Sequence, residues 1–301
     1  MWHEEPSSPR ARKHRLALVL GSGGVRSIAG QGIADRLARE GISPDVVVGC
    51  SSGALFGAQI ARGMQGQAAV SMATTLWSAE LTQKRRWLAY LQLIAPRMTG
   101  FGTGFALRDD QLIAKRIGEA FGDTRLEELP TPLRVVSTEA ATGQAVVLTQ
   151  GRVVDALRAS MAVPIIFPSV CIEGRHLVDG VLSDPLPIGV AADASVVVAL
   201  GFPGGMPRRV DRLSRLVAQT STTLINNLME ARMGAARATG QKVISLELDM
   251  DRHVGLWETA AMPYLYEVGW RAAEARLLDI VAALEQAPKP LEPVAHPVFL
   301  E

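Results

Sequence analysis

The sequence has few cysteines, almost no net charge and no long apolar run, and each absence excludes a class of protein. Its two cysteines, Cys50 and Cys171, cannot form the disulfide framework of a small secreted domain or a cysteine-rich zinc site. The 31 Lys and Arg residues nearly balance the 30 Asp and Glu residues, which argues against non-specific binding to nucleic acid. The longest uncharged stretches, 46–61 and 63–79, are interrupted by Gly, Ser or Gln and fall short of the roughly 20 apolar residues that span a bilayer.

The chain instead has enough apolar residues for a large core. Hydrophobic residues make up 48% of its 301 residues, which suits one large domain. Residues 1–14 are polar and lack the apolar segment of a signal peptide, so we predict a flexible tail and a cytoplasmic protein. Residues 287–301 contain four prolines and are predicted to form a second tail. Because no repeat or linker interrupts residues 15–286, they are predicted to form a single domain.

Short apolar runs alternate with helix-spaced segments along this domain. Residues 16–20 and 46–48 have the continuous apolar pattern of buried strands, and each is followed by glycines and a predicted helix, over 24–41 and 54–62. Further strands are predicted at 133–136, 145–148 and 195–200, and long amphipathic helices at 210–228 and 268–284. The pattern predicts an α/β fold, with a mainly parallel central sheet flanked by helices.

The strongest local signal is a Gly-x-Ser-x-Gly pattern between the second predicted strand and its helix. Gly49 and Gly53 flank Ser51, and small residues there let the strand and helix backbones approach closely. The pattern predicts a nucleophile elbow, in which the Ser51 hydroxyl lies at a helix N-terminus that favours negative charge. The alternative is a tight turn whose serines only cap the helix.

A glycine-rich segment, 21–26, follows the first predicted strand. Its backbone N–H groups could point into a cavity and bind either a phosphate or the oxyanion of an acyl-transfer intermediate. A dinucleotide-binding fingerprint fails here because Arg26 occupies the position of the third glycine. Nucleotide binding is therefore the weakest alternative, and a glycine-rich turn without a ligand is another.

A third segment places Asp179 before Gly180 at the end of a predicted strand. The residues alone do not distinguish a catalytic carboxylate from a turn residue. His176 invites a Ser-His-Asp triad, but its odd offset from Asp179 would send the two side chains to opposite faces of a strand. We therefore predict that His176 is a surface residue.

Together these segments resemble the patatin-like phospholipase family, in particular its small bacterial members. The glycine-rich segment, the Gly49–Gly53 elbow and the Asp179-Gly180 pair occur in the family's order, and residues 156–168 resemble the helix and Pro-rich turn before its Asp motif. The resemblance covers about residues 16–200. It implies a Ser-Asp dyad that needs no metal or cofactor, with Ser51 as nucleophile and Asp179 as base. It also implies an oxyanion hole formed by the backbone of Gly23, Gly24 and Val25, with Arg26 either fixing the loop or adding positive potential.

The implied activity is hydrolysis of carboxylic esters of lipids through an acyl-enzyme. Acyl transfer to another acceptor by the same dyad is one alternative, and a non-catalytic regulatory scaffold is another. The scaffold is suggested by departures from the family pattern, because Ser27 could displace the oxyanion N–H groups. The departures are Ser22, Ser27, the Gly30-Gln31 pair, Glu139 and Val181.

Residues 84–105 join a basic cluster to aromatic and aliphatic residues. This combination predicts either a peripheral contact with an anionic lipid surface, at the inner face of the membrane, or a mobile lid over an acyl pocket. The alternative is a core helix followed by a glycine-rich loop. The predicted partners are thus a lipid or acyl-ester substrate and a membrane surface, and not nucleic acid.

Overall fold

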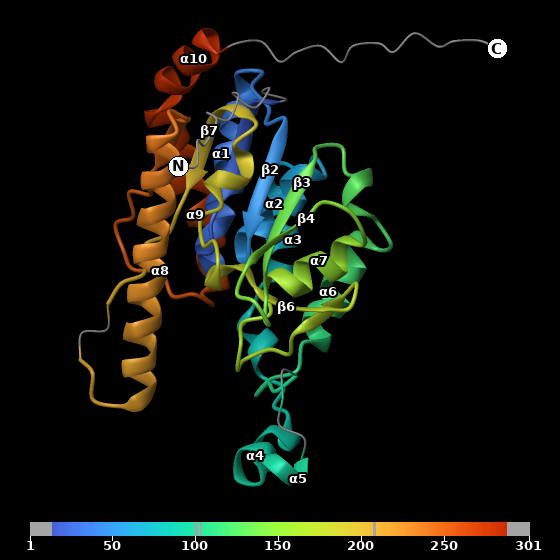
Figure 1. Cartoon of the computed structure of the whole chain (residues 1–301). Helices are drawn as coiled ribbons and strands as arrows, with labels where there is room; N and C mark the ends of the chain where they lie inside the picture. Colours follow the sequence, from blue (N-terminus) through green and yellow to red (C-terminus); the bar gives the residue numbers. More distant parts are fainter. Residues whose placement is uncertain (1–13, 100–101, 103, 207–208, 288–301) are drawn as a thin grey trace, which may run out of the picture.

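A mixed sheet with covering elements on both faces organises the chain (Figure 1). The computed structural model describes residues 14–99, 102, 104–206 and 209–287. The strands are β1 (His14–Leu20), β2 (Val46–Cys50), β3 (Leu133–Glu139), β4 (Ala145–Leu148), β5 (Val170–Ile172), β6 (Arg175–Asp179), β7 (Ala194–Leu200) and β8 (Lys242–Leu246). The α-helices are α1 (Ala29–Arg39), α2 (Ser52–Ala61), α3 (Gly66–Leu76), α4 (Trp87–Ile94), α5 (Pro96–Thr99), α6 (Gln111–Phe121), α7 (Val153–Ser160), α8 (Leu213–Ala238), α9 (Met262–Ala275) and α10 (Leu277–Gln286). Short 3-10 turns are η1 (Gly24–Ile28), η2 (Ala79–Thr82), η3 (Leu126–Glu128), η4 (Gly180–Leu182), η5 (Ile188–Ala191) and η6 (Thr259–Ala261).

The sheet has a parallel centre and antiparallel additions at one end. Its strand order is β5-β6-β3-β2-β1-β7-β8, and β4 also pairs with β3. Strands β3, β2, β1, β7 and β8 pair in parallel, whereas β4, β5 and β6 join in antiparallel pairs. The carboxyl ends of the parallel strands therefore meet at one edge of the sheet, where the loops that follow β1, β2 and β7 lie together.

Strands β2 and β6 share one side of β3. The β2 pairing ends where Cys50 lies opposite Val136, and the β6 pairing begins at the next residue, where Asp179 lies opposite Ser137. Strand β4 occupies the other side of β3 along the same residues. Because β2 runs parallel to β3 and β6 runs antiparallel, their carboxyl ends meet head to head.

Side-chain alternation along the strands builds two separate cores. In β1, Leu16, Leu18 and Leu20 point into the larger core with α1, α2 and α9. Ala17 and Val19 point to the opposite face, into a smaller core that includes η5 and the C-terminal half of α8. Covering both faces explains why the parallel strands have continuous apolar sequences.

The structure confirms the predicted α/β fold with a mainly parallel central sheet flanked by helices. The predicted 24–41 helix is instead a 3-10 turn followed by α1, and the predicted 268–284 helix is divided at Arg276 into α9 and α10. Strand β1 begins at His14, one residue before the predicted domain boundary, and β5 and β8 were not predicted. The two predicted tails otherwise lie outside the described residues, except for Ala287.

Two amphipathic segments leave their apolar faces uncovered. The predicted apolar positions Leu213, Leu216, Val217 and Leu224 do lie on a helix, α8, but all four side chains are exposed. Helix α4 projects from the body of the molecule, so the 84–105 segment is not a core helix (Figure 1). Among the residues that the structure describes, no helix is both long and apolar enough to cross a bilayer.

Candidate active site

Ser51 lies in the sharp turn between β2 and α2. Its backbone has φ 55° and ψ −125°, a strained conformation for a residue other than glycine. The flanking glycines are required by close packing: a Cβ atom on Gly53 would lie 2.3 Å from the Leu20 carbonyl oxygen, and one on Gly49 would lie 2.4 Å from the Ala54 Cα. The elbow therefore raises the serine side chain from the sheet edge at the N-terminus of α2.

A second serine holds the backbone of this turn. The Ser51 N–H donates to Ser160 Oγ at 2.8 Å, and Ser160 Oγ donates to the Val136 carbonyl oxygen at 2.6 Å. Ser160 lies at the end of α7 and is fully buried. Sequence analysis assigned it no role, because its partner is 109 residues away and no local pattern indicates the contact.

The Ser51 hydroxyl donates to the carboxylate of Asp179. The distance from Ser51 Oγ to Asp179 Oδ2 is 2.7 Å, and the side chains are 6% and 0% exposed. The other carboxylate oxygen, Oδ1, accepts the Val181 N–H at 2.8 Å, while the Asp179 N–H donates to the Ala162 carbonyl oxygen at 2.9 Å. These contacts orient Asp179 so that one oxygen is reserved for Ser51.

Burial raises the pKa of Asp179 from 3.8 to about 7. Desolvation is the larger effect, because an ionised carboxylate loses its hydration in the interior. The hydrogen bonds from Val181 and Ser51 oppose this shift by stabilising the ionised form. A carboxylate with a pKa near neutrality can accept a proton from a hydroxyl and later return it, as a general base requires.

The glycine-rich segment lies beside the elbow, and its N–H groups are not equivalent. The Gly23 N–H donates to Ser52 Oγ at 3.1 Å, and the Val25 N–H donates to the Leu256 carbonyl oxygen at 3.1 Å. Among the described residues no acceptor binds the N–H of Gly24, which has a φ of +60°. The N–H of Ser52, directly after the nucleophile, is likewise without an acceptor in the described part of the chain.

Ser27 contributes a hydroxyl where the family pattern has glycine. Its Oγ donates to the Gly21 carbonyl oxygen at 3.2 Å and lies 2.9 Å from Ser52 Oγ. Because the Ser27 proton is directed at Gly21, the Ser52 hydroxyl is left to donate to Ser27. A buried chain of hydrogen bonds therefore runs from the Gly23 N–H through both serines to Gly21, and the Ser27 side chain is part of it.

Arg26 and Phe202 support the same loop from outside. Arg26 Nε donates to the Gly23 carbonyl oxygen at 3.2 Å, and its guanidinium lies 5.3 Å from the centre of the Phe202 ring. Burial lowers the pKa of Arg26 from its ordinary value. The Phe202 ring also covers Gly23, where a Cβ atom would lie 2.2 Å from it.

A large cavity lies behind this loop, between the carboxyl ends of β7 and β8 and helix α8. Its volume is about 770 Å³. Arg26 and Phe202 form part of its wall, so the cavity adjoins the glycine-rich segment. Its wall also includes the charged residues Glu230, Arg237 and Glu247. The apolar side chains of its lining are Leu186, Phe202, Pro203, Met229, Met233, Leu246, Leu248 and Met250. Long unbranched groups suit such a surface, because methionine side chains adapt to irregular shapes.

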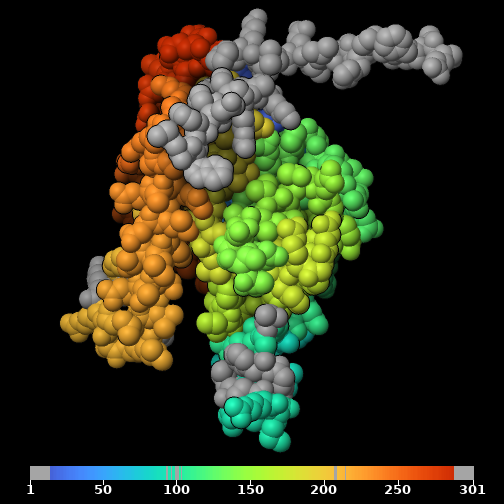
Figure 2. All heavy atoms as spheres, in the orientation of Figure 1, coloured from blue at the N-terminus to red at the C-terminus, as the bar shows by residue number. Residues whose placement is uncertain are grey.

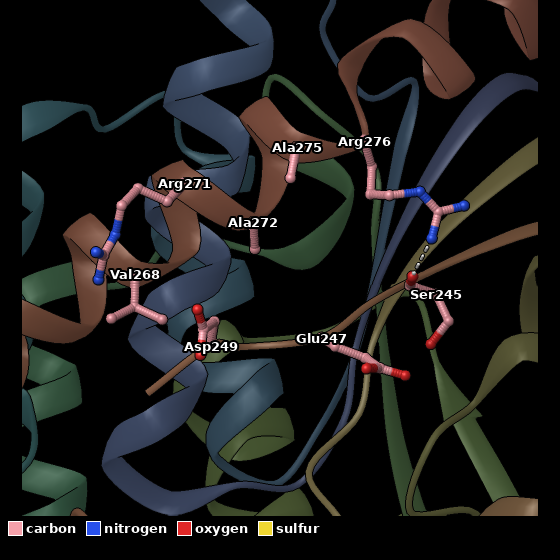
Figure 3. Close-up of a pocket in the computed structure, with 8 residues that line it drawn as sticks. All are labelled: Ser245, Glu247, Asp249, Val268, Arg271, Ala272, Ala275 and Arg276. Atoms are coloured by element: carbon pink, nitrogen blue, oxygen red, sulfur yellow. Dashed lines mark hydrogen bonds between the residues drawn. The ribbon is translucent and has the colours of Figure 1, made fainter. Parts of the chain in front are cut away.

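A separate cavity of about 460 Å³ lies between α9 and the chain after β8 (Figure 3). Glu247, Asp249 and Arg271 give it a charged lining, and Arg276 Nη1 donates to the Ser245 carbonyl oxygen at 3.4 Å. Ser51, Asp179 and the glycine-rich segment do not line it. This cavity is therefore not part of the candidate active site.

The remaining chemically reactive side chains near the motifs lie away from the dyad. His176 is exposed, and its Nδ1 lies 3.3 Å from Ser169 Oγ rather than near Ser51. Cys50 is buried in the smaller core, and burial raises the pKa of its thiol well above the ordinary value. Among the described residues, no three His, Cys, Asp or Glu side chains are grouped closely enough to bind a metal ion.

Residues 18–192 match the family model described as patatin-like phospholipase. An NTE family protein of Mycobacterium tuberculosis strain H37Rv is 32% identical over 218 residues, which cover 69% of this chain and 57% of that protein. Patatin-like phospholipase domain-containing protein 7 of Rattus norvegicus is 32% identical over 190 residues, which cover 62% of this chain and 13% of that protein. The crystal structure of VipD from Legionella pneumophila aligns with a TM-score of 0.44 at 14% identity, over 87% of this chain and 67% of that one.

The raised pKa of Asp179 predicts a pH-dependent effect of Asp179→Asn on stability. Ionising the buried carboxylate costs free energy in the folded state, and this cost grows as the pH rises from about 4, the unfolded pKa, to about 7. Because asparagine carries no charge, the variant should exceed the parent in free energy of unfolding by up to about 4 kcal/mol at pH 8, and by less at pH 5. Denaturant unfolding at both pH values measures this, and a difference that does not change with pH contradicts it.

Removing the Ser27 hydroxyl should disturb the loop beside the nucleophile. Ser27→Ala leaves the buried Ser52 hydroxyl without its acceptor, so we expect labelling of Ser51 by a fluorophosphonate to slow by roughly tenfold. The matched control is Ser137→Ala, which removes an equally buried hydroxyl that has no hydrogen-bond partner among the described residues. Equal labelling rates in both variants would show that the serine chain does not position the loop.

Proposed function

The chain belongs to the patatin-like phospholipase family, and from that premise we propose that it is a serine hydrolase acting on carboxylic esters of lipids. The matched residues, 18–192, include the elbow, the glycine-rich segment and Asp179. The chain spans just over half the length of its mycobacterial relative and a smaller part of the rat protein. The activity is therefore proposed from this chain's own site.

The observation that carries the proposal is the 2.7 Å hydrogen bond from Ser51 Oγ to Asp179 Oδ2. It joins a nucleophile in a strained elbow to a buried carboxylate whose pKa is about 7. Such a pair needs no histidine, because the carboxylate itself exchanges the proton at neutral pH.

In the proposed reaction, Ser51 Oγ attacks the acyl carbonyl carbon and its proton passes to Asp179 Oδ2. The tetrahedral intermediate then breaks the ester bond, and Asp179 returns the proton to the departing alcohol. Water attacks the acyl-enzyme next, giving its proton to Asp179, and cleavage of the acyl–serine bond regenerates the Ser51 hydroxyl. Asp179 therefore acts first as base and then as acid in each half-reaction.

The proposed oxyanion donors are the N–H groups of Gly24 and Ser52, for which the described residues supply no acceptor. Both follow strand ends at the same edge of the sheet, and Ser52 is the first residue of α2, where the helix dipole adds positive potential. Gly23 and Val25 use their N–H groups to hold the loop. Arg26 fixes the same loop through the Gly23 carbonyl group.

The apolar cavity beside the loop supports a long-chain acyl substrate. Eight apolar side chains, Phe202 among them, line a volume of about 770 Å³ next to Arg26. The basic and aromatic residues that precede and form α4 further suggest that the substrate is met at a lipid surface. We therefore propose phospholipids or lysophospholipids as the substrate class.

The dyad is tested by labelling and turnover in parallel. We expect a fluorophosphonate to label the parent protein at Ser51, and Ser51→Ala and Asp179→Asn each to lower ester hydrolysis by at least about a thousandfold. Because the base must be ionised, kcat/KM of the parent should rise with pH to a plateau above about 7.

Three results would contradict this mechanism. They are a parent protein that neither reacts with the fluorophosphonate nor hydrolyses short-chain esters, an Asp179→Asn variant that keeps its activity, and a pH profile without a transition near 7. Product analysis with an added alcohol acceptor separates hydrolysis from acyl transfer, since a transferase would form a new ester in place of the free acid.

Filling the apolar cavity should shorten the acyl chains that the enzyme accepts. Gly234 on α8 lines the cavity, and a Cβ atom there meets no atom within 4 Å. Gly234→Phe should therefore fold normally, lower kcat/KM for long-chain esters by roughly tenfold and leave short-chain esters unaffected. The control, Gly234→Ala, should preserve both activities. An equal loss for both chain lengths would show that the acyl chain lies elsewhere.

A further inference from the structure

The exposed apolar side chains are concentrated at one end of the molecule. Among the described residues, most lie on α4, on α5, on α8 or in segments after the carboxyl ends of strands, and Ile165 and Ile166 lie in the loop between α7 and β5. Val147 and Leu278 lie elsewhere. Monomeric soluble proteins rarely expose apolar residues in such a concentration. The asymmetry indicates that this end, which we call the carboxyl-end face, is covered by something else.

The first part of this face is the projection formed by α4 and α5. Trp87 and Ile94 are 76% and 81% exposed, and the Trp87 and Tyr90 rings lie 5.8 Å apart. Residues 84–99 contain four basic residues and no acidic one. An apolar helix with an aromatic pair and a basic edge has the composition of segments that lie in the interface of an anionic bilayer.

The second part is the N-terminal half of α8. Leu213 and Leu224 are 76% and 65% exposed, with Leu216 and Val217 between them on the same helix. Residues 209–229 include three arginines and one acidic residue, Asp211, which pairs with Arg212 and Arg215. This half of the helix therefore combines an apolar stripe with a net positive charge. Figure 2 shows this end of α8 and the α4 projection as two lobes at the same end of the molecule.

The face surrounds the candidate active site. The Arg86 N–H donates to the Leu107 carbonyl oxygen, and the Leu107 N–H donates to that of Ile165. Ala162 lies shortly before Ile165 in the same loop, and its carbonyl oxygen accepts the Asp179 N–H. The α4 projection is thereby anchored beside the dyad. Exposed apolar residues also lie on the segments next to the dyad and the glycine-rich loop, namely Ile165, Ile166, Leu182 and Leu256.

We propose that the carboxyl-end face is a docking surface for an anionic bilayer, with α4–α5 and the N-terminal half of α8 as two separate insertion points. Two lobes on either side of the site would orient Ser51 toward the lipid, and this role in catalysis rests on the proposed function, whereas binding to the bilayer does not. Charge favours a bilayer over a second copy of the chain, because both lobes are basic. In a symmetric dimer the basic lobes of the two copies would face and repel each other. Anionic headgroups would instead attract both.

The binding test uses the full chain as Ser51→Ala, so that the result does not depend on hydrolysis. Vesicles of phosphatidylcholine, with and without phosphatidylglycerol, are sedimented with the protein at low and high salt. We expect binding to the anionic vesicles, weakened by salt and much weaker on phosphatidylcholine alone. Equal binding to both vesicle types, or none to either, would overturn the proposal.

The two insertion points are tested separately in the same background. Leu213→Asp with Leu224→Asp changes α8, and Trp87→Ala with Ile94→Asp changes α4. We expect each pair to lower vesicle partitioning by roughly tenfold or more, because it removes two apolar side chains from the bilayer. The control is Leu278→Asp, which changes an exposed leucine on α10 and should leave partitioning unchanged.

Further measurements separate this proposal from its rivals. Circular dichroism and Tm identify variants that have failed to fold, and because all changed residues are exposed we expect neither to change. If the parent is a dimer that dissociates in the α8 variant while vesicle binding stays intact, the face binds a second copy of the chain. That result would overturn the proposal that it binds a bilayer. In the active parent background, each pair should lower hydrolysis of vesicle lipid while leaving turnover of a soluble short-chain ester unchanged. Loss of both activities would instead implicate the site itself.

Discussion

The candidate site depends on two strands ending against the same side of a third. Along β3, the partner changes from β2 to β6 between Val136 and Ser137, so the residues after Cys50 and at Asp179 converge. Gly180 allows the junction to close: a Cβ atom there would lie 2.4 Å from the Val136 carbonyl oxygen and 3.0 Å from Cys50 Sγ. The short distance between Ser51 and Asp179 follows from sheet register, and the surrounding hydrogen bonds then refine it.

The sheet register buries the Asp179 carboxylate, and ionising a buried carboxylate costs free energy. The neighbouring hydrogen bonds reduce this cost. Desolvation raises the pKa of Asp179, whereas the Val181 N–H and the Ser51 hydroxyl stabilise the ionised form. The hydroxyl of Ser160 stabilises the turn at Ser51, and the hydroxyl of Ser27 stabilises the glycine-rich segment. The strained elbow is therefore held by a hydrogen bond from a distant helix, and the buried carboxylate is held by one local and one distant donor.

Sequence analysis predicted the local features well, because each depends on a short pattern. The α/β fold and the family resemblance followed from apolar runs and three glycine-containing motifs, and both are confirmed. The contacts of Ser160 with Ser51 and of Phe202 with Gly23 had no local signal, since the two residues of each pair lie more than a hundred positions apart. Periodicity correctly predicted a helix around Leu213–Leu224 but could not show that its apolar face is uncovered, because burial depends on whether another element is present to cover it.

The head-to-head meeting of β2 and β6 also has a consequence for folding. Ser51 and Asp179 are 128 residues apart, and β3 must bind both strands before the two side chains can meet. Contacts of such long sequence separation form late, because closing the intervening loops is entropically costly. The hydrogen bond between Ser51 and Asp179 therefore requires that most of the sheet has assembled, because β3 must already pair with both β2 and β6.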